Sequence, residues 1–316
     1  MKKKLLSLAV SGAILWALYS RVGSTGILDA VAACDAGLLA VSLALVAPIT
    51  WVTALRFLLL APPGTCTAGE ATRLTLAAST LNLVLPSKMG DLAKAWFLRD
   101  SSGVPVTLAL PLVVFEKAWD MLALLAWCAI GLALVAGQIP GAAPLGALIV
   151  AGLVTGALLL SSRRIAAAGF RIAGRFAPGK IGLKLAGLAA GWDAVLAQFW
   201  PRRGRVASVA MVSLGLWLLH LLQIWMFALA LRSHPPLLFT LGAAPIAILA
   251  GLLPLTFAGV GTRDAALVWL FHAFLSPAQG AALGILCTSR YLMPALAGLP
   301  FLHRYLGGRQ PLNLQN

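Results

Sequence analysis

The sequence LNLVLPSKMGD, residues 81–91, interrupts an apolar segment with an amide, a proline, a lysine, a glycine and a carboxylate. The sequence LLPLTFAGVGTRD, residues 252–264, repeats this order, with Leu-Pro, a small polar turn, glycine and then an acidic residue. Proline ends a helix, and an acidic residue favours the start of the next one. Apolar segments interrupted at corresponding positions of two halves indicate the binding site of a transporter. We therefore expect these two breaks to meet at membrane depth.

The composition indicates an integral membrane protein. The 316 residues are 60% hydrophobic and 10% charged, with a mean hydropathy of +0.93, whereas soluble domains carry about 25% charged residues. The net charge of +15 comes mostly from basic residues that flank apolar segments, which indicates topology signals and anionic-lipid contacts and not nucleic acid. The four cysteines are scattered without metal-ligand spacing, so we expect no disulfide, metal or other cofactor.

We predict an all-α polytopic fold, formed as a single transmembrane domain over residues 1–316. The predicted full spans are residues 5–19, 37–60, 104–136, 145–160, 206–231 and 278–302. The first follows three lysines and no convincing cleavage site follows it, which favours an uncleaved helix over a signal peptide. Arg56 lies near the end of the second span, where its long side chain is expected to snorkel towards water.

Both breaks are predicted to be re-entrant helical hairpins. Residues 72–85 form an apolar segment of 14 residues, which as a helix is about 21 Å long and too short for a hydrocarbon core of ~30 Å. A second short helix follows from Gly90-Asp91, and residues 237–253 and 262–274 form the second pair. Irregular backbone at this depth requires a protein-buried or watered cavity. The alternative is that both hairpins cross fully, which gives ten crossings.

The charge distribution predicts the topology. Fourteen lysines and arginines lie in the segments predicted to be cytoplasmic, against Arg21 and Arg232 outside, which places both termini in the cytoplasm and the chain in the inner cell membrane. Residues 37–136 and 206–302 then form an inverted-topology repeat. Residues 163–205 carry nine basic residues and one acidic residue, with apolar residues at helical spacing. We expect them to form cationic helices in the cytoplasmic interface.

Charges inside the predicted spans are candidate functional groups, because they cost several kcal/mol unless they are paired or hydrated. Glu116 and Asp120 are four residues apart and share a helix face with each other. They need neutralising cations, for which the candidates are Lys88, Lys94, Arg263 and Arg290. One interpretation is a structural ion-pair network that holds the hairpins. The other is that some of these cations are only partly neutralised and bind a phosphate.

The glycines of the two breaks support an anion site. Gly90 before Asp91, and Gly259 and Gly261 before Asp264, place small residues where a short helix begins. Such helix ends leave free N–H groups and a positive dipole end. Each motif alone indicates no more than a tight turn. Together with lysine and arginine at membrane depth, the pair favours an anionic ligand.

Four ordered motifs resemble a known family. These are NLVLPSKMGD at residues 82–91, FEKAWD at residues 115–120, GVGTRDAAL at residues 259–267 and Arg290 in the last span. They are similar to the flippase-like family, the lysylphosphatidylglycerol synthase transmembrane region, and we expect the stand-alone form without the soluble synthase domain. Asp91 and Asp264 stand where the family commonly has Glu, and Lys117 where it often has Arg. The resemblance implies movement of lipids or polyprenyl-phosphate-linked sugars between leaflets.

The predicted function is translocation of an anionic phospholipid or a polyprenyl-phosphate-linked lipid, without enzymatic activity. The predicted substrate-binding residues are Asn82, Lys88, Gly90, Asp91, Glu116, Lys117, Asp120, Gly259, Gly261, Arg263, Asp264 and Arg290. Lys88, Arg263 and Arg290 would hold the phosphate, while Glu116 and Asp120 would position or release these cations. The alternatives are a secondary transporter of a small anionic solute, an intramembrane lipid-modifying enzyme and a structural partner of a lipid- or glycan-synthesising enzyme. A homodimer is a further arrangement that the sequence leaves open.

Overall fold

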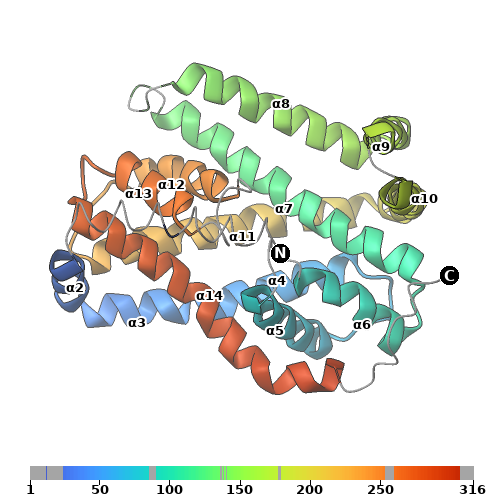
Figure 1. Cartoon of the computed structure of the whole chain (residues 1–316), viewed down its shortest axis with the longest axis horizontal. Coiled ribbons are helices and arrows are strands. Elements are labelled where there is room, and N and C mark those ends of the chain that lie inside the picture. Colours follow the sequence, from blue (N-terminus) through green and yellow to red (C-terminus); the bar gives the residue numbers. More distant parts are fainter. Residues whose placement is uncertain are drawn as a thin grey trace.

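The computed structural model describes residues 12, 24–84, 90–135, 137, 139, 141–176, 179–252 and 260–306. Every regular element in this part of the chain is a helix, which confirms the all-α prediction (Figure 1). The predicted first span lies almost wholly outside the described residues. The centres of both breaks, residues 85–89 and 253–259, and the C-terminal residues 307–316 lie outside them as well.

Five predicted spans coincide with helical segments that are long and apolar enough to cross a membrane. They are Ala36–Leu60, Val106–Val135, Ala142–Ser161, Arg203–Ala230 and Pro277–Leu302. The first is built from α3 (Ala36–Ala44) and α4 (Val46–Leu60), and the others are α7 (Val106–Val135), α8 (Ala142–Ser161), α11 (Arg203–Ala230) and α14 (Pro277–Leu306). The short helix α2 (Ser24–Ala32) precedes them. Asp35 caps α3 by accepting a hydrogen bond from the Leu38 N–H at 2.9 Å, which satisfies a free donor of the first turn.

The two breaks separate helices that are shorter than a span. The first lies between α5 (Ala68–Val84) and α6 (Ala93–Ser102), and the second between α12 (Leu237–Gly251) and α13 (Thr262–Leu270). The longest of the four has 17 residues, whereas a span needs about 20. Residues 90–92 form a 3₁₀ turn ahead of α6, and Gly103 ends α6 with a φ of 65°.

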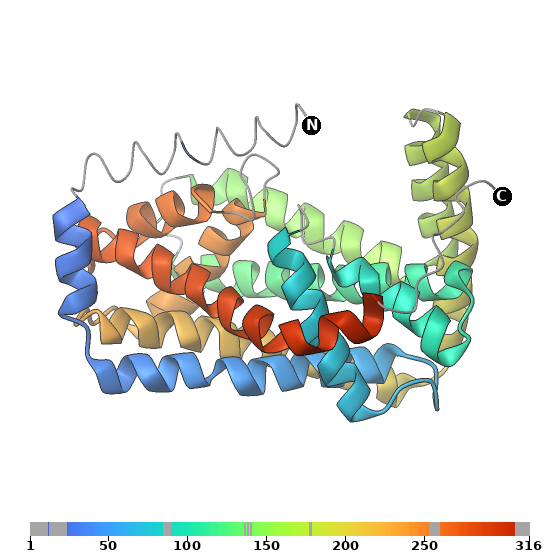
Figure 2. The same cartoon turned by 60° about the horizontal axis from the view of Figure 1, so that its bottom comes forward.

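The packing of these helices is reciprocal between the two halves of the chain. We call the helix before each break its first arm and the helix after it its second arm, and the halves are residues 37–136 and 206–302. Each first arm packs on the last span of the other half, α5 on α14 and α12 on α7. The second arms pack on the last span of their own half, α6 on α7 and α13 on α14. The first spans α4 and α11 contact each other, and the long helices run in roughly the same direction in Figure 2.

Small residues allow the helices of these two contacts, α5 with α14 and α12 with α7, to lie close together. A side chain at Gly298 of α14 would collide with Leu76 and Thr80 of α5, and the Thr80 hydroxyl donates to Ala295 O at 2.7 Å. A Cβ at Gly131 of α7 would lie 2.5 Å from Gly242 Cα of α12, so these two helices approach closely at this pair of glycines. Close backbone approach at small residues is the usual basis of helix association in membranes.

The basic segment forms two helices at one end of the bundle. They are α9 (Arg163–Phe176) and α10 (Gly179–Phe199), which stand across the direction of the spans in Figures 1 and 2. α10 packs against the start of α7, where Gly191 lies against Thr107 and Pro111. The helical prediction for this segment is therefore confirmed.

Candidate functional site

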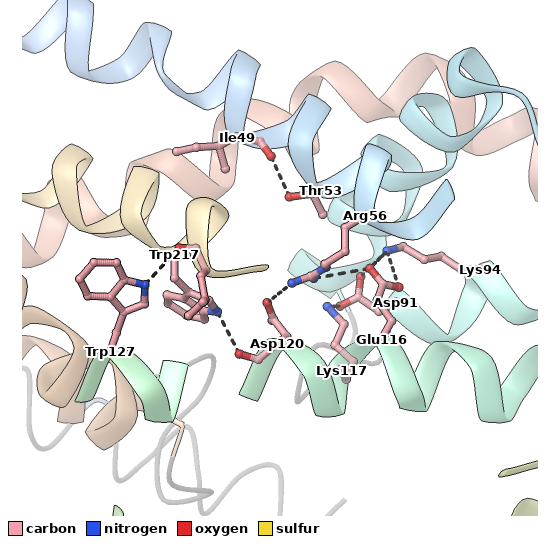
Figure 3. Close-up of polar contacts among 11 residues, drawn as sticks. Ile49, Thr53, Arg56, Asp91, Lys94, Glu116, Lys117, Asp120, Trp127 and Trp217 are labelled. Atoms are coloured by element: carbon pink, nitrogen blue, oxygen red, sulfur yellow. Dashed lines mark hydrogen bonds and ion pairs between the residues drawn. The ribbon is translucent and has the colours of Figure 1, made fainter. Parts of the chain in front are cut away.

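Six charged side chains from three parts of the chain form one group, which we call the charge cluster (Figure 3). It contains three cations and three carboxylates, namely Arg56, Lys94, Lys117, Asp91, Glu116 and Asp120. Arg56 comes from α4, and Asp91 and Lys94 come from the turn and helix after the first break. The other three project from α7, since residues 116, 117 and 120 lie within one helical turn or just beyond it.

The inner part of the charge cluster is fully buried. Lys94 Nζ donates to both Glu116 carboxylate oxygens, at 3.1 and 3.2 Å, and Arg56 Nη2 lies 3.6 Å from Glu116 Oε1. None of these three side chains is more than 1% exposed. Lys94 also lies 5.0 Å from the centre of the Phe57 ring, which adds a cation–π contact. Because an unpaired buried charge is strongly destabilising, these contacts hold α4, α6 and α7 together.

The outer part of the charge cluster reaches the surface of the chain. Arg56 Nη1 donates to Asp120 Oδ1 at 2.6 Å, and Lys117 Nζ lies 2.8 Å from Asp91 Oδ2. The Lys117 and Asp120 side chains are 38% and 27% exposed. Trp217 of α11 donates its indole N–H to the Asp120 carbonyl at 2.9 Å. One edge of an otherwise buried network is therefore accessible from outside.

The pairing corrects one expectation and refines another. Arg56 was expected to snorkel towards water, but it is 1% exposed and binds Asp120 and Glu116, because its position on α4 faces α7. Lys94 was expected among the cations that neutralise the α7 carboxylates, and it does so. Glu116 is thus held by Lys94 and Arg56. Its predicted role of positioning or releasing Lys88, Arg263 and Arg290 stays a prediction, since Lys88 lies outside the described residues.

A second set of polar residues, which we call the second group, surrounds the start of α13. Arg263 donates to Asp264 Oδ1 from Nε at 2.9 Å and from Nη2 at 2.6 Å. Its Nη2 also donates to Gly284 O at 2.9 Å and to Thr288 Oγ1 at 2.7 Å, both on α14. The guanidinium of Arg263 therefore faces the Asp264 carboxylate.

Asp264 also fixes the backbone where α13 begins. Its Oδ2 accepts the Gly261 N–H at 2.9 Å, so one carboxylate caps the helix and pairs with Arg263. Gly261 has a φ of 108°, a conformation that favours glycine. On α14, a Cβ at Gly284 would lie 2.8 Å from Asp264 Oδ1, so this glycine makes room for the carboxylate.

Arg290 of α14 is buried without a carboxylate partner among the described residues. It is 4% exposed, its Nη2 donates to the Tyr291 hydroxyl at 3.1 Å, and its guanidinium lies 5.0 Å from the Tyr291 ring centre. Its Nε and Nη1 have no hydrogen-bond partner in the described part of the chain. Arg290 lies two residues after Thr288, the residue that Arg263 contacts. The α13–α14 region therefore carries two guanidinium groups and one paired carboxylate.

The remaining predicted residues lie in the first break, apart from Gly259 of the second. A Cβ at Gly90 would collide with Ala78 O and Asn82 N, so this glycine lets the start of the second arm lie against α5. Asn82 has a buried Oδ1 without a partner among the residues that the structure describes. Lys88 and Gly259 lie outside the described residues.

The family model described as the lysylphosphatidylglycerol synthase TM region matches residues 4–298, which include both breaks, the charge cluster and Arg290. The chain belongs to this family. No curated protein matches the sequence at a significant level. Membership indicates a membrane protein with a lipid-related function, and the five apolar spans indicate that it crosses the membrane several times.

In this member of the lysylphosphatidylglycerol synthase TM family, the two polar groups differ in charge. The charge cluster balances three cations with three carboxylates, whereas Arg263, Arg290 and Asp264 leave one surplus positive charge. The described residues contain no group of three or more His, Cys, Asp or Glu that suits a metal ion. The surplus positive charge gives the second group the charge that binding an anion would need.

Proposed function

We propose that the chain translocates an anionic phospholipid or a polyprenyl-phosphate-linked lipid between leaflets, with Arg290 as the main phosphate-binding group. The observation that carries this proposal is the buried guanidinium of Arg290, two of whose nitrogens have no partner in the described part of the chain. A buried cation without a counter-charge is costly, and a ligand phosphate would supply that charge. Arginine suits this task because its planar fork can bind two phosphate oxygens at once.

The position of Arg290 next to the second break supports movement and not only binding. Arg263 of α13 reaches the same stretch of α14, since its Nη2 donates to Thr288, and its charge is balanced by Asp264. A phosphate that left Arg290 would meet a guanidinium that already has a carboxylate, so it would be held less strongly there. Graded binding of this kind lets a ligand enter and leave, while the acyl or prenyl chains stay in the bilayer.

The reciprocal packing of the two halves supports a transport mechanism based on an inverted repeat. Each first arm packs on the last span of the other half, α5 on α14 and α12 on α7. We propose that the breaks are re-entrant hairpins of opposite direction and that small shifts at these two exchanged contacts open the site to one leaflet and then the other. The carboxylates of the charge cluster would hold the scaffold in this mechanism and would not perform catalysis.

Liposomes that contain the purified protein and a fluorescent phosphatidylglycerol test the proposal. Bleaching of the outer leaflet with a membrane-impermeant reductant reports the rate at which inner-leaflet lipid appears outside. We expect Arg290→Ala to lower this rate about 10–100-fold, the loss of one hydrogen bond to a charged group being worth ~1.5–3 kcal/mol. Arg73→Ala is the matched control, because Arg73 is exposed on α5. A wild-type rate in folded Arg290→Ala protein would rule out this role for Arg290.

A secondary transporter of a small anionic solute is the alternative, because a guanidinium recognises phosphate with or without acyl chains. The lipid-related function of the family favours the lipid. The same liposomes, loaded with radiolabelled glycerol phosphate in place of the fluorescent lipid, separate the two. Release of the glycerol phosphate that depends on Arg290, without lipid movement, would support the solute transporter.

A further inference from the structure

Helix α9 carries two parallel stripes of exposed side chains that no part of the proposed transport mechanism uses. One is apolar and consists of Ile165, Ile172 and Phe176, which are 39%, 55% and 86% exposed. The other is basic and consists of Arg164, Arg171 and Arg175, all of them exposed. Both stripes have spacings of seven and four residues, so each follows one face of the helix. At 100° per residue the basic stripe lies about 100° around the helix from the apolar one.

The third face of α9 is packed on the rest of the protein, which fixes the direction of both stripes. Ala166 is buried, and the Phe170 ring meets the Trp192 ring of α10 edge-on at 5.9 Å. α10 is in turn tied to the end of α8, since Trp192 and Trp200 donate their indole N–H groups to Leu159 O and Leu160 O at 3.1 and 2.7 Å. α9 therefore cannot turn its exposed stripes inwards without breaking this packing.

The place of α9 in the molecule is that of a helix lying along a membrane surface. Only Ser162 separates the apolar span α8 from α9, so α9 begins where that span ends. In Figure 2 α9 and α10 stand across the direction in which the spans run, and in Figure 1 they are seen nearly end-on beside the end of α8. If the spans cross the bilayer, α9 lies along its plane.

The charge of α9 identifies its partner. Arg163 is paired with Asp193 of α10, at 3.3 Å, but no carboxylate among the described residues pairs with Arg164, Arg171 or Arg175. An interfacial helix inserts its apolar face at the boundary of the acyl chains and presents its basic face to head groups. Arginine near a bilayer surface is attracted to anionic lipid, and its aliphatic stem allows the charge to reach the head groups.

We infer that α9 is a fixed membrane-surface helix whose two stripes bind the anionic head-group layer of the membrane that the chain spans. The apolar stripe lies among the upper acyl chains, and the basic stripe contacts the lipid phosphates beside it. This surface is separate from Arg290, so it is expected to bind lipid whether or not the protein translocates any.

The test uses the full-length protein in lipid nanodiscs, with a polarity-sensitive fluorophore at one of two positions. The two carriers are Ile172→Cys, in the apolar stripe, and Ala167→Cys, which is exposed on the opposite side of the helix. Both are made with Cys34→Ser and Cys66→Ser, since Cys128 and Cys287 are buried. Nanodiscs contain phosphatidylcholine with or without phosphatidylglycerol, and a fraction of the lipid carries a quencher on its acyl chain.

We expect a blue-shifted emission and strong quenching for the label at residue 172, and neither for the label at residue 167. Phosphatidylglycerol should increase the quenching at residue 172, and the triple variant Arg164→Gln, Arg171→Gln, Arg175→Gln should lose that increase. Equal exposure of both labels to water would overturn the inference and would leave the stripes free for an acidic protein. Quenching at residue 172 that is equal with and without phosphatidylglycerol would overturn the assignment to anionic lipid.

Discussion

At the scale of single residues, Arg263 shows how one guanidinium serves both structure and function. Its Nε and Nη2 both donate to Asp264 Oδ1 while Nη2 also reaches Gly284 O and Thr288, so the contacts use two nitrogens of the planar guanidinium. Lysine at this position would keep the charge opposite Asp264 but has a single nitrogen, so it could not reproduce the two-nitrogen contact with the carboxylate. Substitution of Arg263 by lysine therefore tests the hydrogen-bond geometry while the charge opposite Asp264 is kept.

We predict that Arg263→Lys folds and is produced normally but translocates lipid at least about tenfold more slowly, since one or more hydrogen bonds to a charged group are lost. Arg263→Ala should in addition be destabilised by about 3–5 kcal/mol, because it leaves Asp264 buried and unpaired. The liposome assay measures the first effect and thermal unfolding in detergent the second. Near-normal lipid movement in Arg263→Lys would show that this position supplies positive charge alone.

The sequence predicted which charges lie inside apolar segments but not which of them pair. Glu116 and Lys94 could be named because charges inside apolar segments are rare and costly. Arg56 was missed because it lies near the end of a predicted span, where a long side chain is usually able to reach water. Its pairing with Asp120 depends on how α4 faces α7, a contact across 64 residues of chain. Local pattern carries no information about a contact of that kind.

At the scale of helices, segment length and proline position were sufficient to predict the elements. The spans α7, α8, α11 and α14 lie within a few residues of their predicted bounds, because apolar length decides them. The half-length arms were likewise visible from the Leu-Pro breaks. The packing of each first arm on the last span of the other half was not, since it depends on where a small residue lets two backbones approach, as Gly298 does at Leu76.

The close crossing of α5 and α14 at Gly298 predicts how the packing of α14 responds to a larger side chain. Gly298→Val should force the two helices apart, because its side chain would collide with Leu76 and Thr80. We expect a loss of at least ~1–3 kcal/mol in stability, the usual cost of overpacking a close contact, with a parallel loss of lipid movement. Gly215→Val on α11 is the matched control, since no side chain or distant backbone lies within 4 Å of its added Cβ. Equal thermal stability of the two variants would contradict the close crossing.

At the scale of the whole molecule, the native cysteines offer a direct test of its orientation. Cys34 lies just before the apolar span Ala36–Leu60 and Cys66 just after it, so we expect the two thiols on opposite sides of the membrane. Cys128 and Cys287 are buried. From the excess of basic residues around α9 and α10, we predict that the Cys66 end is cytoplasmic and that the Cys34 end faces outward.

The thiols of Cys34 and Cys66 should both react slowly at neutral pH. Burial raises the pKa of Cys66 to about 11, with a smaller contribution from Glu70, and burial also raises the pKa of Cys34, although Arg232 opposes it. Because only the thiolate reacts, labelling of each should accelerate as the pH rises from 7 to 9 while the pH stays below these pKa values. The orientation experiment is therefore best performed near pH 9.

We predict that a membrane-impermeant maleimide added to intact cells at that pH labels Cys34 and leaves Cys66 unlabelled, and that permeabilised cells label both. Cys34→Ser and Cys66→Ser assign the signal to each position, and neither residue belongs to the charge cluster or to the Arg263 and Arg290 group. Labelling of Cys66 but not Cys34 in intact cells would reverse the orientation. The α9 surface would then face the outer leaflet, and anionic lipid would be required there instead of on the cytoplasmic side.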